Sequence, residues 1–264
     1  MKKYFTLISG SIQKKLAFPA NLTLWLLVDI AQIAILPFIW VAIIHEKGNI
    51  NGFAPADIIT YYVILTFIAF ATSSHSAKYV EQDIVTGNLN KFLTKPLIYC
   101  IRNYVSGLGY SIIAGTIALC TIIVLYFFFP NVILLPFSRA HLALFIISLF
   151  IASFLSTCIQ QITGFVSFWM GDTSGVRHLR YMTEKVFSGE FAPLTLYPIF
   201  MQTVASVLPF KYLFFIPISL YLGKISVQEG IYEIIKGIIW LGIFLCILLI
   251  MWKQGVKRYD GSGA

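Results

Sequence analysis

The sequence predicts an all-α integral membrane protein. Of its 264 residues, 58% are hydrophobic and 11% are charged, whereas soluble domains carry about 25% charged residues. Several apolar runs exceed the roughly 18 residues that indicate a transmembrane helix. We therefore expect residues 1–264 to form a single transmembrane domain of about six spans, which leaves no room for a soluble catalytic domain of about 100 residues or more.

The apolar runs place five clear spans and one disguised span. The clear spans are expected at Asn21–Ile44, Ile58–His75, Tyr104–Phe129, His141–Met170 and Ile231–Trp252. The disguised span, fifth in order, is expected near Ser174–Gly189. There Arg180 and Glu184, four residues apart on one helix face, are expected to pair and so to lower the cost of entering the membrane.

Positive charge predicts the orientation, because Lys and Arg are enriched in cytoplasmic loops. Most of the 19 Lys and Arg residues fall in the N-terminal segment, in the loop after the second span, before the fifth span and at the C-terminus. Both termini are therefore expected in the cytoplasm. The net charge of +8 is interpreted as a signal of topology and of contact with lipid head groups, and nucleic acid is not an expected partner.

Residues 1–20 precede the first span and are expected to form an interfacial helix. Apolar residues there alternate with Lys14, Lys15 and Gln13, a composition that suits a helix lying on the inner leaflet. A partly ordered basic tail is the alternative.

Residues 76–103 form the predicted cytoplasmic loop, whose most polar part, residues 81–97, reads EQDIVTGNLNKFLTKPL. Apolar side chains alternate there with charged side chains of both signs. Gly87 is expected to separate two short helical pieces, and Pro96 to stop the second or start a new one. An amphipathic helix pair of this kind suits docking onto a soluble partner, and an ordinary solvated loop is the alternative.

Residues 190–228 are apolar but are interrupted by Pro198, Pro209 and Pro217. One more full crossing here would make the number of spans odd and would move the basic C-terminus outside. We therefore expect short helices that dip into the outer leaflet and return, which is permissible where irregular backbone is buried in protein.

Motifs for bond chemistry do not occur in the sequence. It contains no GxxxxGK[ST], HExxH, GxSxG or paired-cysteine pattern, so the chain is expected to be no enzyme and to bind neither nucleotide nor metal itself. Polar residues in spans are candidates for a translocation path, since a charge in mid-membrane costs about 2.5–3.5 kcal/mol. These are Asp29, Gln32, His75, Gln160 and Gln161. Interhelical hydrogen bonds worth about 0.6 kcal/mol each are the alternative.

Two stretches resemble one known family. An acidic residue after the second span, a Gly-Asn-Leu step, an apolar pair and Lys-Pro-Leu resemble the cytoplasmic loop of type-2 ABC exporter permeases, the six-span subunits of bacterial ABC transporters with a separate ATPase subunit. The matching residues are Glu81, Asp83, Gly87, Leu89, Phe92, Leu93, Pro96 and Leu97. SGEFAPLTLYP at 188–198, LPF at 208–210 and Pro217 are similar to the short extracellular re-entrant helices of that family.

The resemblance implies a permease subunit in the cytoplasmic (inner) membrane of a prokaryote. It would pair with a second identical or homologous permease and dock two ATPase subunits, which would bind the ATP and Mg, and it would act as an exporter. The abundant aromatic residues, 23 Phe and 14 Tyr, fit a hydrophobic or amphipathic substrate, and anchoring of the spans at the membrane interfaces is the alternative. The implied ATPase-coupling residues are Glu81, Asp83, Thr86, Gly87, Asn88, Leu89, Asn90, Lys91, Phe92, Leu93, Lys95 and Pro96. The implied re-entrant residues are Pro193, Leu194, Pro198, Pro209 and Phe210.

Three other functions stay open at this stage. An ion-driven secondary transporter would show inverted repeats and discontinuous helices at mid-membrane, and the sequence shows no clear internal repeat. An integral-membrane enzyme would need a convergent set of catalytic residues. A non-transporting immunity or assembly protein would share the same spans, so the sequence does not separate it from a permease.

Overall fold

The computed structural model describes residues 2–16, 52–72, 74, 76–95, 98–128, 130 and 133–259, and this part of the chain is helical and contains no β-strand. The longer helices are α1 (Lys2–Leu16), α3 (Pro55–Thr72), α4 (Ser76–Val85), α6 (Tyr99–Phe128), α7 (Arg139–Phe165), α9 (Ser174–Phe187) and α12 (Val227–Arg258). The shorter ones are α5 (Asn90–Leu93), α8 (Ser167–Met170), η1 (Leu194–Leu196), α10 (Ile199–Val207), η2 (Pro209–Tyr212) and α11 (Phe215–Tyr221).

Four stretches of the described chain are long and apolar enough to cross a membrane, namely Pro55–Val85, Tyr99–Phe128, Arg139–Met170 and Val227–Arg258. They overlap the second, third, fourth and last predicted spans, and the first of them continues to Val85, ten residues into the predicted cytoplasmic loop. The first predicted span lies outside the described residues. The total of six spans therefore stays a prediction.

The predicted fifth span corresponds to α9, which starts at Ser174 as expected but ends at Phe187. Its 14 residues extend over about 21 Å, less than the roughly 30 Å of a hydrocarbon core, so α9 is too short to cross on its own. The predicted pair within it is present, because Arg180 and Glu184 form an ion pair.

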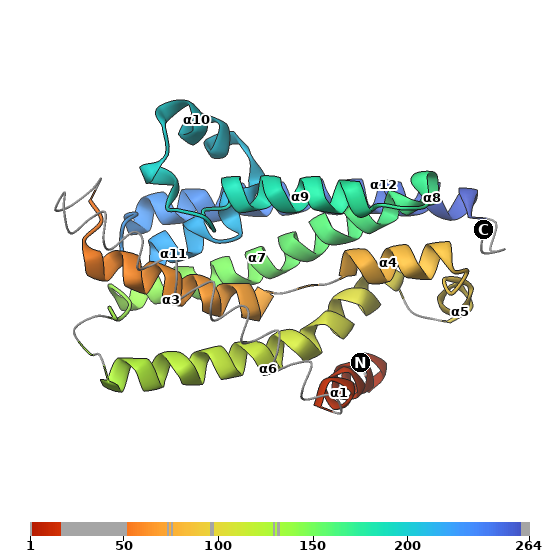
Figure 1. Cartoon of the computed structure of the whole chain (residues 1–264), viewed down its shortest axis with the longest axis horizontal. Helices are drawn as coiled ribbons and strands as arrows, with labels where there is room; N and C mark the ends of the chain where they lie inside the picture. The colour runs from red at the N-terminus through yellow and green to blue at the C-terminus, as the bar shows by residue number, and fades with distance from the viewer. Residues whose placement is uncertain are drawn as a thin grey trace.

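The long helices lie side by side and give the molecule two distinct ends (Figure 1). One end, called the α5 end, contains α5, α8 and the last turns of α12. The opposite end, called the α10 end, contains α10 and α11. Helix α1 packs against α6, where the absence of a side chain at Gly109 makes room for Ser11. The interfacial placement of α1 stays a prediction.

Helix α7 is the central helix and contacts α12, α4, α11 and α3. Its small residues Ser148, Ala152 and Ser156 are all buried, so their stripe is used for packing within the chain. At Gly164 the α4 backbone lies close against α7. A Cβ at this position would lie 2.7 Å from the Val80 Cβ and 2.8 Å from the Ala77 carbonyl oxygen, so α4 approaches α7 only because residue 164 is glycine.

Prolines stand at the start of three of the four short helices between α9 and α12. Pro193 precedes η1, Pro198 precedes α10 and Pro209 is the first residue of η2. Proline suits these positions because it has no N–H to lose at the start of a helix. Leu194 is buried and Phe210 packs against the main core. Whether these helices re-enter the membrane stays a prediction.

A pair of glycine substitutions tests the α4–α7 contact. Gly164→Ala places a Cβ against Val80 and the Ala77 carbonyl, pushes α4 away from α7 and should cost about 1–3 kcal/mol of unfolding free energy, the usual range for overpacking. Gly175→Ala, at a helical position with no atom within 4 Å, is the matched control and should be neutral or stabilising. Thermal unfolding in detergent measures both. Equal melting temperatures for the two variants would contradict the close approach of α4 to α7.

Candidate functional site

The candidate site is the turn at the α5 end that joins α4 to α5 and α6. We call residues 81–95 the elbow. Helix α4 ends at Val85, and Gly87 adopts a left-handed backbone with φ of 75°, a conformation that favours glycine. The amide of Leu89 then donates to the carbonyl of Asp83 at 2.7 Å. Gly87 therefore separates two helical pieces, and the chain reverses direction there.

Leu89 holds the elbow against the helix bundle. Its side chain is fully buried in an apolar cluster at the α5 end, formed by the buried residues Val80, Ile84, Leu89, Tyr99, Cys158, Phe165 and Leu248. Members of this cluster come from α4, α6, α7 and α12, so the buried leucine links the turn to four helices. Burying a leucine stabilises such contacts by about 1.5–3 kcal/mol.

Aromatic rings reinforce this cluster. Tyr99 of α6 stacks on Trp252 of α12 with 5.0 Å between ring centroids, and Phe165 of α7 lies 5.4 Å from the same indole. Phe92 of α5 packs on Tyr99 at 5.9 Å, and the Arg102 guanidinium lies 3.9 Å from the centre of the Phe92 ring. The rings thus join α5, α6, α7 and α12 at one end of the molecule.

Asp83 connects α4 to the start of α6. Its Oδ2 accepts a hydrogen bond from the Tyr99 hydroxyl at 2.8 Å and lies 3.5 Å from the Arg102 guanidinium. Arg102 also donates to Asn103 Oδ1 at 2.8 Å. The carboxylate is half-buried, and its charge is balanced inside the chain.

Glu81 connects α4 to the start of α9. Its carboxylate accepts a hydrogen bond from the Thr173 hydroxyl at 2.7 Å and forms an ion pair with Arg177. Arg177 in turn donates to the Thr173 hydroxyl at 2.9 Å. The backbone amide and hydroxyl of Ser174 donate hydrogen bonds to the exposed Asp172 carboxyl at the turn before α9, and these bonds lower the pKa of that carboxyl. Glu81 and Asp83 therefore both act as internal ties of the elbow.

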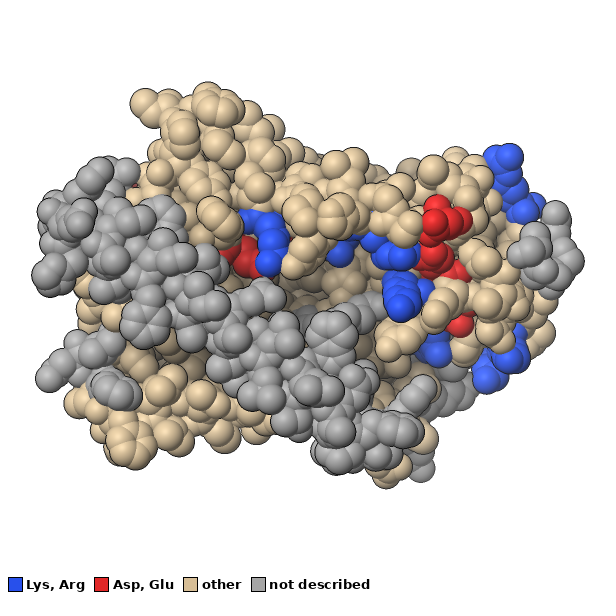
Figure 2. All heavy atoms as spheres, in the orientation of Figure 1, with Lys and Arg blue, Asp and Glu red and all other residues tan. Residues whose placement is uncertain are grey.

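The other side of the elbow is exposed. The exposed residues are Gln82, Thr86, Asn90, Lys91, Leu93, Thr94 and Lys95. Leu93 has 42% of its surface exposed, next to the lysines. Lys91 bonds to the Asn88 amide oxygen at 2.6 Å, which orders the turn. Figure 2 shows charged side chains of both signs gathered at this end of the molecule.

The structure places the other predicted site residues differently. Gln161 is 2% exposed, and its amide donates to the Cys100 carbonyl at 3.1 Å, so it links α7 to the start of α6. This matches the alternative of interhelical hydrogen bonding. Gln160 is half-buried. Asp29, Gln32, His75 and Pro96 lie outside the described residues. Among the residues that are described, no group of three His, Cys, Asp or Glu side chains could hold a metal ion.

Sequence reasoning missed the partners of the two acidic residues. The basic residues after the second span and before the fifth span, Arg102 and Arg177 among them, entered the prediction only as signs of topology, and Thr173 and Trp252 had no role in it beyond the end of the last span. These residues lie on other helices, at separations along the chain that have no periodic pattern. A helical spacing rule detects pairs three or four residues apart, such as Arg180 and Glu184, and cannot detect these contacts.

Two leucines four residues apart test the division of the elbow into a buried and an exposed side. Leu89→Ala should cost about 2–5 kcal/mol because it opens a cavity in the cluster. Leu93→Ala should change stability by less than about 0.5 kcal/mol. Limited trypsin digestion after Lys91, combined with thermal unfolding, measures both effects. If Leu93→Ala is the more damaging change, the assignment of the two sides is wrong.

Comparison with known proteins identifies the family of the chain. Residues 30–263 match the family described as ABC-2 family transporter protein. No curated protein and no solved structure gave a significant match. Permeases of this family are generally non-catalytic and work with ATPase subunits. Because the match extends over most of its length, the chain belongs to the ABC-2 family of transporter proteins.

Proposed function

We propose that the chain is the permease subunit of an ATP-driven exporter and that the elbow docks onto the ATPase subunit. The observation that carries the proposal is the two-sided elbow. Its inner side is tied to α6, α7, α9 and α12, and its outer side presents Leu93 and the lysines to a partner. A loop that served only as a connection would not need ties to four helices.

The ties suggest how motion would pass from the ATPase into the membrane. ATP binding would favour one arrangement of the ATPase pair, and a ligand shifts an equilibrium only through its different affinity for two states. A displaced elbow would move α9 through the Glu81–Arg177 pair and α6 through Asp83, Tyr99 and Arg102. The chain would transmit a conformational change and perform no bond chemistry.

In this proposal the α5 end faces the cytoplasm, in the inner membrane of a prokaryote. Lys253, Lys257 and Arg258 at the end of α12 and the lysines of the elbow all lie at this end, as the enrichment of cytoplasmic segments in positive charge favours. A second identical or homologous permease would complete the path. The substrate would be hydrophobic or amphipathic and would leave the cytoplasm.

Substitutions on the outer side of the elbow test the docking. We expect Leu93→Asp and Lys91→Glu each to reduce recovery of a P-loop ATPase, co-purified in nanodiscs from the native host, by at least about tenfold, because a lost interface anchor costs about 2 kcal/mol or more. Lys257→Glu is the control. It makes the same charge change at an exposed position near the end of α12, and we expect the ATPase to stay bound. Mass spectrometry and ATP hydrolysis provide the readout.

Two results would overturn the proposal. The first is recovery of no P-loop ATPase with the unchanged protein under any condition, which would favour an ion-driven transporter or a non-transporting membrane protein. The second is equal recovery with all three variants, which would move the docking surface away from the elbow. Circular dichroism of each variant separates loss of docking from loss of fold.

A further inference from the structure

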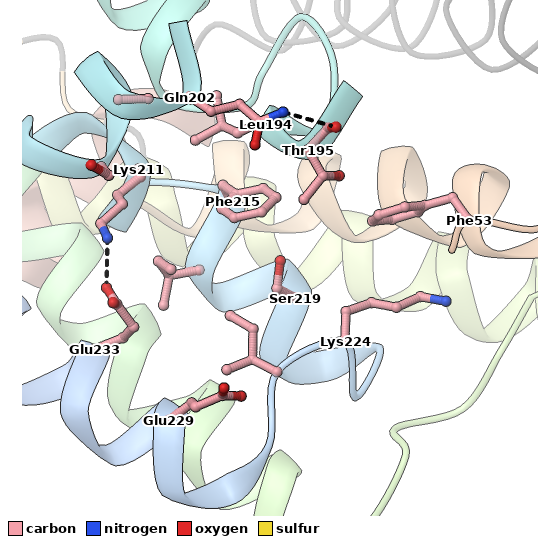
Figure 3. Close-up of a pocket in the computed structure, with 14 residues that line it drawn as sticks. Phe53, Leu194, Thr195, Gln202, Lys211, Phe215, Ser219, Lys224, Glu229 and Glu233 are labelled. Carbon is pink, nitrogen blue, oxygen red and sulfur yellow. Dashed lines mark hydrogen bonds and ion pairs between the residues drawn. The ribbon is translucent and has the colours of Figure 1, made fainter. Parts of the chain in front are cut away.

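The α10 end contains a cavity of about 430 Å³ that the proposed function does not use. Its walls come from η1, α10, η2, α11 and the first turns of α12 (Figure 3). The volume falls within the roughly 300–1,000 Å³ of ligand sites. Apolar side chains such as Leu194, Phe215 and Ile216 form part of the wall, and polar groups interrupt it at separate points.

Ser219 of α11 is the most informative of these polar groups. Only 1% of its surface is exposed, and its hydroxyl has no hydrogen-bond partner in the described part of the chain. In Figure 3 the hydroxyl points toward the space bordered by Phe215 and Thr195. A buried hydroxyl without a partner costs about 1–3 kcal/mol, so its presence in a cavity wall points to a ligand that supplies the partner.

Lys211 supplies a buried positive charge to the same cavity. It is 7% exposed, and its ammonium lies 2.7 Å from Glu233 Oε2, while Lys236 lies 2.9 Å from Oε1 of the same carboxylate. The Tyr212 hydroxyl also donates to Glu233, and burial together with this carboxylate raises the pKa of Tyr212, which keeps the donor protonated. Because an ammonium has three N–H donors, Lys211 keeps donor capacity beyond Glu233.

The formal charge of the cavity wall is zero. Lys211 and Lys224 contribute two positive charges, and Glu229 and Glu233 contribute two negative charges. Lys224 forms an ion pair with Asp57 at 2.6 Å. The exposed Glu229 accepts hydrogen bonds at its Oε2 from the backbone amide and hydroxyl of Ser226. If a bare anion bound there, the carboxylate of Glu229 would repel it, because no cation of the cavity wall pairs with Glu229. A ligand that carries both an anion and a cation would match it.

Outside the cavity, α10 presents an apolar surface. Ile199 is 82% exposed, Phe200 69% and Val207 68%. In a membrane protein such a surface suits lipid chains. One kind of molecule carries all the groups that this site would recognise. It has an oxygen-rich anion for Lys211 and Ser219, a cation for Glu229 and apolar chains for the surface of α10.

We infer that this cavity binds the head group of a zwitterionic phospholipid. The phosphate diester accepts hydrogen bonds from Lys211 and Ser219, and the ammonium of the head group faces Glu229. The site lies at the end of the molecule opposite the elbow, so the inference does not depend on ATPase docking. On the topology proposed above, the lipid belongs to the outer leaflet.

Matched lysines test the inference, because Lys211 and Lys236 both pair with Glu233 but only Lys211 lines the cavity. The full-length protein is delipidated in detergent and titrated with phosphatidylethanolamine, with native mass spectrometry and thermal stabilisation as readouts. We expect Lys211→Gln to weaken binding at least tenfold and Lys236→Gln to stay within twofold of the unchanged protein. Equal weakening by both variants would overturn the inference.

Two serine variants test the inference independently of whether the Lys211 variant folds. Ser219→Ala removes a hydroxyl that has no partner, so the lipid-free melting temperature should stay the same or rise while lipid-induced stabilisation falls. Ser148→Ala removes a buried hydroxyl that bonds to the Phe145 carbonyl and does not line the cavity, so it should leave lipid-induced stabilisation unchanged. Unchanged lipid binding in Ser219→Ala would overturn the role of that hydroxyl.

Two further ligands test whether the site needs the zwitterionic head group and whether it needs the acyl chains of a membrane lipid. Phosphatidylglycerol, which is anionic, should bind at least tenfold more weakly than phosphatidylethanolamine, and equal binding would overturn the zwitterion. Soluble glycerophosphoethanolamine should stabilise the protein only weakly, because it lacks the acyl chains. If it stabilises as well as the lipid, the membrane is not the source and the inference of a phospholipid fails.

Discussion

The two carboxylates of α4 are the interactions on which the α5 end depends. Glu81 and Asp83 lie in the last turns of α4, at the start of the elbow, and are bonded to different helices, Glu81 to the start of α9 and Asp83 to the start of α6. Half-buried carboxylates are costly unless they are paired and hydrogen-bonded, so these contacts hold α4 in one orientation. The orientation of α4 in turn sets the direction in which the chain continues after the turn at Gly87.

That constraint gives the elbow its two sides. Leu89 follows directly and is buried under the aromatic cluster, whereas Leu93, one helical turn later, is exposed. A partner that binds the exposed side of the elbow therefore binds a segment that is already bonded to or packed against α6, α7, α9 and α12.

Sequence reasoning succeeded where the signal is local. Hydropathy located the helices around α3, α6, α7 and α12, and the four-residue spacing identified the Arg180–Glu184 pair. It overestimated α9, because an amphipathic helix of 14 residues has too few apolar positions to reveal its end. It could not find Arg177, Trp252 or the cavity at Ser219, since each depends on helices distant in the sequence. Glu81 and Asp83 were recognised as important, but their internal partners were not.

The central claim is that the elbow and the start of α9 move as one body. Spin labels at Thr94 and His178, both exposed, measure this within one chain after the four native cysteines are replaced. The account predicts the same intrachain distance distribution in nucleotide-free and ATP-bound complexes, while the distance between the Thr94 positions of paired permeases changes. A shifted or broadened intrachain distribution on ATP binding would contradict the account.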